Sequence, residues 1–307
     1  MGANTQLGDL RFQMPFSDSP SRLTVTHDDI TAGLRALGLR HGDGLMLHSS
    51  LKSFGLVQGG PRTIILALME VLSPEGTLLM PSFNHGAPFQ AGGPGYYAPL
   101  ETPTRNGIIP DTFWRTPGVL RSLDPTHAFC AWGRHAERYV AFHHRTLTMG
   151  PGSPLGLLCA DDGYALLAGV DYRPNTFHHV VEMSTGAPCL GLRTEEYPVL
   201  LPDGRTVKGR TWGWRQRACP LTDQNRYADL MRSRQLQREV VVGGSHLILY
   251  RLQDCFRVVA EVLSEGRGAF PPCSRCTIRP RRVPQTVPSD WDTATGTLKP
   301  DSAAWSY

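Results

Sequence analysis

The chain has 307 residues, 40% of them hydrophobic and 19% charged, which is the composition of a globular protein with one large or two modest domains. No apolar run approaches the ~18 residues that span a bilayer, and the amino terminus has no apolar signal core, so we expect a cytoplasmic protein with no membrane partner. The net charge of +4 is far from the clustered basic surface typical of nucleic-acid-binding proteins, and we expect no nucleic-acid partner.

The first third of the chain alternates between helical and extended patterns. Residues 1–22 are polar and irregular, and we interpret them as an N-terminal arm. A start rich in Thr and Asp, followed by leucines at helical spacing, predicts a capped amphipathic helix that ends near Gly42. Residues 44–50 (GLMLHSS) then predict a short strand, and residues 59–83 a loop, a helix and a second strand. This order is typical of an α/β fold with a βαβ crossover.

The middle of the chain opens with a long segment that lacks clear periodicity. Residues 84–110 are rich in Gly, Pro, Tyr and Asn, and they are too long for a simple connection, which favours a binding loop. Strands are predicted over residues 126–133 and 164–170, with a short helix over 134–144 between them.

The last third begins with a predicted β-hairpin over residues 194–215, which turns at a Pro-Asp-Gly sequence at 202–204. Helices are predicted over residues 222–236 and 249–263. After residue 265 the composition becomes basic and rich in proline, so we expect residues 266–307 to form an extension of the single α/β domain.

The cysteines do not form a disulfide framework, because there are seven of them and they are scattered along the chain. Cys273 and Cys276 have the spacing of half a zinc site, but the chain has no second pair of this kind. We therefore expect no bound metal and two thiols that are free or occasionally oxidised. The arginines around them are interpreted as a solvated tail.

The sequence PNTFHHVVE at 174–182 follows the strand predicted over 164–170 and carries two histidines and a glutamate. Asn175 and Thr176 are favourable residues for the start of a helix, which would place His179 and Glu182 on one face and point His178 elsewhere. A carboxylate beside an imidazole fixes its tautomer and raises its basicity, as a general base requires. From spacing alone, two ordinary histidines remain an equally good interpretation.

Four segments in series (45–83, 102–133, 150–158 and 175–182) resemble the aminoglycoside 3-N-acetyltransferase family, also called the antibiotic N-acetyltransferases. The resemblance covers roughly residues 28–265. It implies a three-layer α/β/α domain with a mixed central sheet over residues 23–265, between the N-terminal arm and the C-terminal extension.

The resemblance also implies an activity. It predicts an acetyl-CoA-dependent N-acetyltransferase that acts on a small-molecule amine by direct transfer, foremost the 3-amino group of a 2-deoxystreptamine aminoglycoside, and so confers antibiotic resistance. In the family pattern N-T-x-x-H-x-x-E, His179 is the base and Glu182 its supporting acid. Acylation of another amine in natural-product biosynthesis and a non-catalytic CoA-binding regulator are the alternatives. We expect a monomer or a homodimer.

Two further sets of site residues are predicted. The segment HSSLKSFG resembles the acetyl-CoA loop of the family, because small residues after a strand let backbone N–H groups approach phosphates and a lysine adds a cation. The predicted cofactor residues are Ser49, Ser50, Lys52, Ser53, Phe54, Gly55, Arg121 and Ser122. The predicted substrate residues are Asn175, Thr176, Asp171, Asp111 and Asp223, the last three as acidic groups for a polycationic acceptor.

One motif departs from the family. Where the family usually reads H-P-T-H-S, this chain has DPTHA, so that Asp124 and Ala128 replace common residues while His127 is kept. A secondary functional role and a structural role are equally good predictions for His127.

Overall fold

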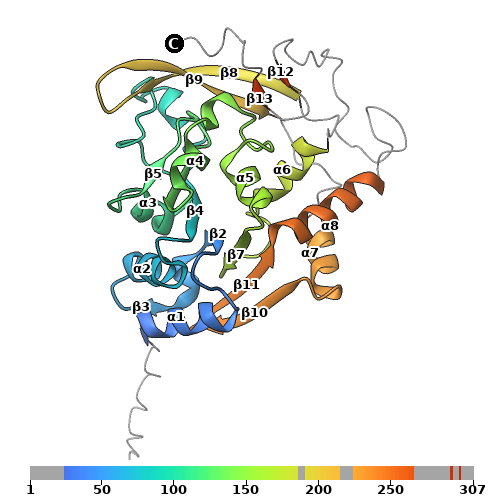
Figure 1. Cartoon of the computed structure of the whole chain (residues 1–307). Helices are drawn as coiled ribbons and strands as arrows, with labels where there is room; N and C mark the ends of the chain where they lie inside the picture. Colours follow the sequence, from blue (N-terminus) through green and yellow to red (C-terminus); the bar gives the residue numbers. More distant parts are fainter. Residues whose placement is uncertain (1–23, 186–190, 215–223, 266–290, 293–296, 299–307) are drawn as a thin grey trace, which may run out of the picture.

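The computed structural model describes residues 24–185, 191–214, 224–265, 291–292 and 297–298 (Figure 1). The N-terminal arm, most of the C-terminal extension, Asp223, Cys273 and Cys276 lie outside these residues. The limits of the arm and the extension, and the absence of a zinc site, therefore stay predictions. In the described part of the chain, no helix is long and apolar enough to cross a membrane.

A seven-stranded mixed sheet forms the centre of the molecule, in the order β10-β11-β7-β2-β4-β6-β5. β7 (Tyr164–Ala168), β2 (Gly44–Ser49) and β4 (Thr77–Pro81) are parallel. The flanking strands β10 (Gln237–Val242), β11 (Ser245–Arg251), β6 (Phe129–Gly133) and β5 (Leu120–Arg121) are antiparallel to their neighbours. The predicted mixed sheet is confirmed.

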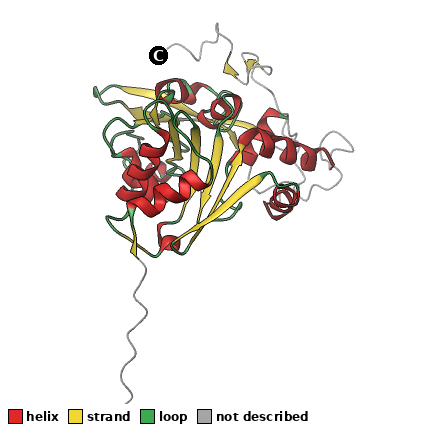
Figure 2. Cartoon of the chain, turned by 60° about the horizontal axis from the view of Figure 1, so that its bottom comes forward, coloured by secondary structure: helices red, strands yellow, loops and turns green. Residues whose placement is uncertain are grey.

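Helices cover both faces of the sheet (Figure 2). One layer contains α1 (His27–Ala36), α2 (Pro61–Leu72) and α3 (Ile108–Trp114); the other contains α4 (Ala136–Val140), α5 (Pro154–Ala160), α6 (Phe177–Ser184), α7 (Gln224–Ser233) and α8 (Leu252–Glu265). Successive strand residues alternate between two cores: Leu45 and Leu47 pack with α1 and α2, and Met46 packs with α5 and α6. The three-layer α/β/α arrangement is confirmed.

The predicted hairpin is also present, as β8 (Gly191–Leu200) and β9 (Thr206–Trp214). It connects to the segment over residues 84–110 through a bridge between Tyr97 and Val199. Smaller elements are β1 (Thr24–Val25), β3 (Leu56–Val57), β12 (Trp291–Asp292), β13 (Thr297–Leu298) and the 3₁₀ helices η1 (Leu51–Phe54), η2 (Ala87–Phe89) and η3 (His143–Arg145).

The helix predicted over residues 249–263 was wrong at its start. Residues 249–251 belong to β11, and α8 begins at Leu252. β11 is covered on both faces, with Leu249 in one core and Tyr250 in the other. A strand buried on both sides shows a continuous apolar run, which periodicity does not distinguish from the start of a buried helix.

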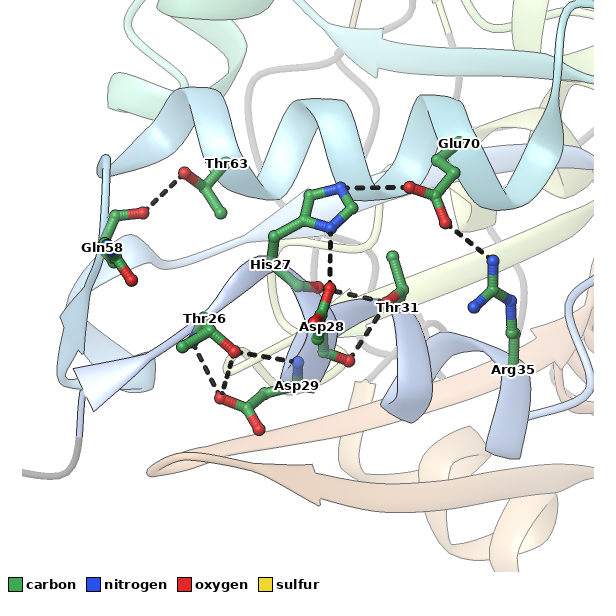
Figure 3. A network of polar contacts seen from close by, with 9 residues as sticks. All are labelled: Thr26, His27, Asp28, Asp29, Thr31, Arg35, Gln58, Thr63 and Glu70. Carbon is green, nitrogen blue, oxygen red and sulfur yellow. Dashed lines mark hydrogen bonds and ion pairs between the residues drawn. The ribbon is translucent and has the colours of Figure 1, made fainter.

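The amino terminus of α1 is closed by a capping box (Figure 3). The Thr26 hydroxyl accepts a hydrogen bond from the backbone N–H of Asp29 at 3.2 Å, and the Asp29 carboxylate accepts one from the Thr26 N–H at 2.8 Å. His27 and Arg35 reach Glu70 on α2 at 3.4 and 2.7 Å. The Thr/Asp-rich start thus caps α1 as predicted, and ion pairs hold α1 beside α2.

We expect Thr26→Ala to lower the free energy of unfolding by about 1 kcal/mol, because the Asp29 N–H loses its partner. Urea denaturation measures this difference. Thr112→Ala is the matched control, because the Thr112 hydroxyl bonds to the Ile108 carbonyl inside α3 and alanine is a better helix former. An equal loss in both variants would contradict a capping role.

Candidate active site

The site lies at one edge of the sheet, where the parallel strands β2 and β7 end side by side. Ser49 is in register with Ala168, and the N–H of Ser50 donates to the Ala168 carbonyl at 3.0 Å. The chain leaves β2 into the segment expected to bind acetyl-CoA and leaves β7 into α6. Carboxyl ends of parallel strands are the usual ligand-binding edge of α/β proteins.

His179 and Glu182 form a hydrogen-bonded pair on α6. The distance between His179 Nδ1 and Glu182 Oε2 is 2.8 Å, as the i, i+3 spacing predicts. The Glu182 side chain is fully buried, whereas the His179 side chain is 35% exposed. Because a carboxylate only accepts, Nδ1–H of His179 donates to it and Nε2 keeps its lone pair. The geometry suits an imidazole base that is accessible from solvent.

His178, next to this pair, has a different hydrogen-bond partner. Its Nδ1 lies 2.5 Å from the Asn175 carbonyl oxygen, and the ring is buried. The centroids of the His178 and His179 rings are 3.9 Å apart. Ligand atoms of His178, His179 and Glu182 lie within 4.8 Å of one another, which is close enough for a metal ion to bind to all three. The absence of a metal stays a prediction.

Asn175 is buried and hydrogen-bonded within the protein, and its predicted role in substrate binding stays a prediction. Its side chain is fully buried; Oδ1 accepts from the Phe177 N–H at 3.2 Å and Nδ2 donates to the Tyr227 hydroxyl at 3.3 Å. Thr176 is partly buried, with its hydroxyl 3.4 Å from Nε2 of His48 on β2. Asn175 therefore anchors the start of α6, and Thr176 connects this start to the neighbouring strand.

The residues predicted to bind acetyl-CoA divide into two groups. Lys52 and Gly55 are exposed, and Ser50 is half-buried; a side chain at Gly55 would meet open space. Ser49 ends β2, and its buried hydroxyl has no hydrogen-bond partner among the residues that the structure describes. These observations fit a segment that receives hydrogen bonds and negative charge from a ligand.

Ser53 and Phe54 face the protein. The Ser53 hydroxyl donates to the Ser50 carbonyl at 2.7 Å and lies 2.9 Å from the Ser245 hydroxyl. Phe54 is buried in the core beneath the segment. Both side chains hold the turn in place, and their contact with acetyl-CoA stays a prediction.

Arg121 and Ser122 also lie in the interior, and their role as cofactor residues stays a prediction. The Arg121 guanidinium donates to the carbonyls of Ser82, Pro99 and Thr102. The Ser122 hydroxyl lies 2.8 Å from His143 Nδ1 and accepts from the Phe129 N–H. An Arg is retained in the interior only where carbonyls or aromatic rings take up its charge, and both surround this one.

The predicted acidic residues are bound by local partners. The Asp111 carboxylate accepts from Trp114 Nε1 at 3.0 Å and from Arg115 Nε at 3.3 Å, on α3 in the other helical layer. Asp171 forms an ion pair with Arg173 at 2.8 Å. Asp111 lies on the other side of the sheet from His179, and Asp171 pairs with Arg173 at the surface. The role of both as substrate residues stays a prediction.

Three further histidines lie close to the elements of this site: His85 and His127 are neighbours, and His48 contacts Thr176 at the start of α6. His127 is buried, and its ring centroid is 5.2 Å from that of His85. Burial lowers the pKa of His127 to about 4. The Asp124 carboxylate raises this pKa, whereas positive charge on His85, His179 or His143 lowers it further. Burial also lowers the pKa of His48 to about 4. His127 and His48 are therefore neutral near pH 7, and His127 is close enough to His179 for their charges to interact.

Sequence reasoning did not identify His48 or His85. A polar residue one position before the end of a buried strand is the signal that could have found His48. His85 has φ +53°, which a non-glycine residue rarely adopts outside functional or tight turns.

The segment over residues 84–110 borders a cavity of about 510 Å³. Proline, alanine and tyrosine side chains form much of its wall, with Glu101 and Arg105 as its charged residues. Asn84 belongs to the same wall and donates to the Pro125 carbonyl at 2.8 Å, next to the DPTHA motif. Asn84 therefore connects the wall of the cavity to the segment that contains His127, and the binding role of residues 84–110 stays a prediction.

The chain is similar in sequence to a family of known proteins. The sequence profile of the family described as aminoglycoside 3-N-acetyltransferase matches residues 46–264. The chain is 36% identical over 175 residues to the SPbeta prophage-derived aminoglycoside N(3')-acetyltransferase-like protein YokD of Bacillus subtilis strain 168, covering 51% of this chain and 64% of that protein. It is 31% identical over 242 residues to aminoglycoside N(3)-acetyltransferase IV of Salmonella sp, covering 77% of this chain and 85% of that protein.

A solved structure is also similar. The acetyltransferase AAC-VIa bound to sisomicin superposes with a TM-score of 0.68 at 26% identity, over 80% of this chain and all of that chain.

We expect Asn175→Ala to lower the free energy of unfolding by about 1–3 kcal/mol, because it leaves the Phe177 N–H and the Tyr227 hydroxyl without this partner in a buried place. The same substitution in a Tyr227→Phe background should cost less, since the shared hydrogen bond is already lost. Chemical denaturation of the four proteins in this cycle measures the coupling. Strict additivity would contradict the anchoring role.

Proposed function

The chain belongs to the aminoglycoside 3-N-acetyltransferase family, a family of acyltransferases, and on this premise we propose that it transfers an acetyl group from acetyl-CoA to an amine with His179 as the general base. The observation that carries the proposal is the 2.8 Å hydrogen bond between His179 and the fully buried Glu182.

The chemistry follows from this pair. Nε2 of His179 takes a proton from the acceptor nitrogen as that nitrogen attacks the thioester carbonyl, and the resulting imidazolium lies beside the Glu182 carboxylate. The C–S bond then breaks, and the thiolate takes up the proton held by His179 and leaves as CoA, which restores the neutral imidazole. Glu182 holds the ring in one tautomer throughout. No covalent acetyl-enzyme is required.

Residues at and after the end of β2 support the proposal that acetyl-CoA binds there. Acetyl-CoA carries phosphate groups, and Lys52 is an exposed cation on the segment that leads away from the sheet. The Ser49 hydroxyl, which has no partner among the described residues, lies at the strand end next to β7, on the path from this segment to α6. We assign donor binding to Ser49, Ser50, Lys52 and Gly55.

The acceptor is an aminoglycoside, and the amine is the 3-amino group. The names of the relatives and the sisomicin-bound neighbour support this assignment. In this chain the cavity beside His85 has room for a sugar ring, and Glu101 supplies a carboxylate for a second ammonium group. Glu101 takes the place that was first predicted for Asp111.

Replacement of His179 by alanine should lower kcat/KM by about 100-fold or more, because the amine loses its base. The affinity for acetyl-CoA should stay unchanged, since the ring acts on the acceptor. Steady-state kinetics and isothermal titration measure the two quantities. His41→Ala is the control, as His41 is exposed before the start of β2, at the other end of that strand from His48. Activity of His179→Ala within tenfold of wild type would exclude this base.

Glu182→Gln should lower kcat/KM by about 10- to 1,000-fold, less than the loss of His179, because the ring keeps a hydrogen-bond partner but loses its charge support. The acidic limb of the pH profile should move to lower pH, since the imidazolium is no longer stabilised by a carboxylate. Profiles of kcat/KM against pH test this. An acidic limb at the wild-type position would mean that Glu182 does not act on His179.

The class of acceptor is tested by a thiol-release assay with aminoglycosides and simple amines. Release of CoA with aminoglycosides, and a product acetylated at the 3-amino group by NMR, is the expected result. Release only with other amines would favour a biosynthetic acyltransferase, and tight acetyl-CoA binding without release would favour a regulator.

A further inference from the structure

The cavity bordered by residues 84–110 carries two opposite charges. Among the described residues that line it, only Glu101 and Arg105 are charged, and the rest are neutral, with proline and alanine prominent. The lining therefore has no net charge. This balance is unexpected for a site that takes a polycationic acceptor, because several ammonium groups are best matched by several carboxylates.

The other polar groups of the lining are engaged within the protein. The Asn84 side chain donates to the Pro125 carbonyl at 2.8 Å and accepts from the Gly86 N–H at 2.8 Å. The Thr102 hydroxyl accepts from the Ala98 N–H at 2.9 Å. By contrast, the side chains of Glu101 and Arg105 form no hydrogen bond or ion pair with the residues that the structure describes. Both charges are therefore available to a ligand.

The backbone that carries the two charges is fixed at both ends. The Glu101 N–H donates to the Ala98 carbonyl at 3.1 Å, and the Arg105 N–H donates to the Phe83 carbonyl at 2.7 Å. Between them, the buried Arg121 guanidinium donates to the Thr102 carbonyl. Neither charge can leave the cavity without breaking such contacts.

The charge of Arg105 also acts on the buried part of this region. Burial lowers the pKa of His85, and the positive charge of Arg105 lowers it further. The His85 ring in turn lies beside that of His127, with 5.2 Å between the centroids. An ammonium group that entered the cavity on this side would meet the same positive charge.

No other predicted carboxylate compensates for Arg105. Asp111 lies on α3, on the other side of the sheet from α6, and Asp171 forms an ion pair with Arg173 at 2.8 Å. Glu101 is thus the one acidic residue among the described lining residues. The cavity suits an acceptor that directs one ammonium group to Glu101 and an uncharged part to Arg105.

We propose that Arg105 is a specificity-determining residue, which disfavours acceptors that bring an ammonium group to its side of the cavity. The protein then prefers aminoglycosides with few ammonium groups to densely charged ones. A like charge placed against unwanted ligands is a common way to obtain selectivity. The proposal rests on the proposed function, because it takes this cavity as the acceptor site, and it changes no step of the transfer.

A series of charge variants tests the proposal with sisomicin, the aminoglycoside bound by AAC-VIa. Arg105→Gln should lower KM for sisomicin by about 3- to 10-fold, the effect of one like charge at a partly solvated distance, and Glu101→Gln should raise it by a similar factor. Both should leave KM for acetyl-CoA unchanged. Arg105→Lys keeps the charge and should keep the wild-type KM for sisomicin.

Arg134→Gln is the matched control, because it removes an exposed positive charge at the opposite edge of the sheet, where β4 begins. It should leave KM for sisomicin as in wild type. An equal decrease in Arg134→Gln would mean that only the net charge of the protein matters. An unchanged or raised KM in Arg105→Gln would overturn the proposal, and a raised one would show that the guanidinium binds the acceptor.

Salt distinguishes a charge effect from a change of shape. In ~1 M NaCl the Debye length falls to about 3 Å, so the difference in KM between wild type and Arg105→Gln should shrink. A difference that persists at high salt would contradict selection by charge.

Isothermal titration without acetyl-CoA separates this proposal from the proposed function. Arg105→Gln should bind sisomicin about 3- to 10-fold more tightly than wild type and gain less for 2-deoxystreptamine, which has fewer ammonium groups. If wild type acetylates sisomicin but the two proteins bind it equally, only the role of Arg105 fails. If wild type releases no CoA with any aminoglycoside, the proposed function fails, and tighter binding by Arg105→Gln would still support selection by charge.

Discussion

The parallel pairing of β2 with β7 is the constraint on which the site depends. It brings the two carboxyl ends to one edge, so that the segment after Ser49 and the helix after β7 leave the sheet side by side. His48 then reaches Thr176 at the start of α6, although 128 positions separate them in sequence. The pairing is buried on both faces by helices, so the core fixes where the two strands end relative to each other.

Several histidines in this part of the molecule are buried. His48, His127 and His143 are removed from water, and burial lowers the pKa of each. Such groups cost free energy unless they are hydrogen-bonded, and hydroxyls of Ser122, Thr126 and Thr176 lie beside these rings. His179 differs from these three histidines, because it is partly exposed and its ring donates directly to a carboxylate.

The sequence was most informative where the chemistry is local. Spacing of three residues on a helix sufficed to pair His179 with Glu182, and Thr and Asp at a helix start sufficed to cap α1, because both interactions lie within one turn. It was least informative about whether a side chain faces the interior of the protein or a ligand site. Phe54 and Arg121 have residue types that a cofactor site could use, yet both face the interior, and no local pattern distinguishes the two directions.

The sequence by itself determined the α/β architecture, the main helices and most strands of the sheet, and the family, because these depend on periodicity and on ordered local motifs. Only the tertiary structure decided which polar residues share the edge of the sheet. Asp124, Thr148 and Thr211 come from three separate segments, and they meet because β9 packs over the loop that follows β5. Contacts between distant segments depend on how the layers pack, and that packing is a property of the whole core.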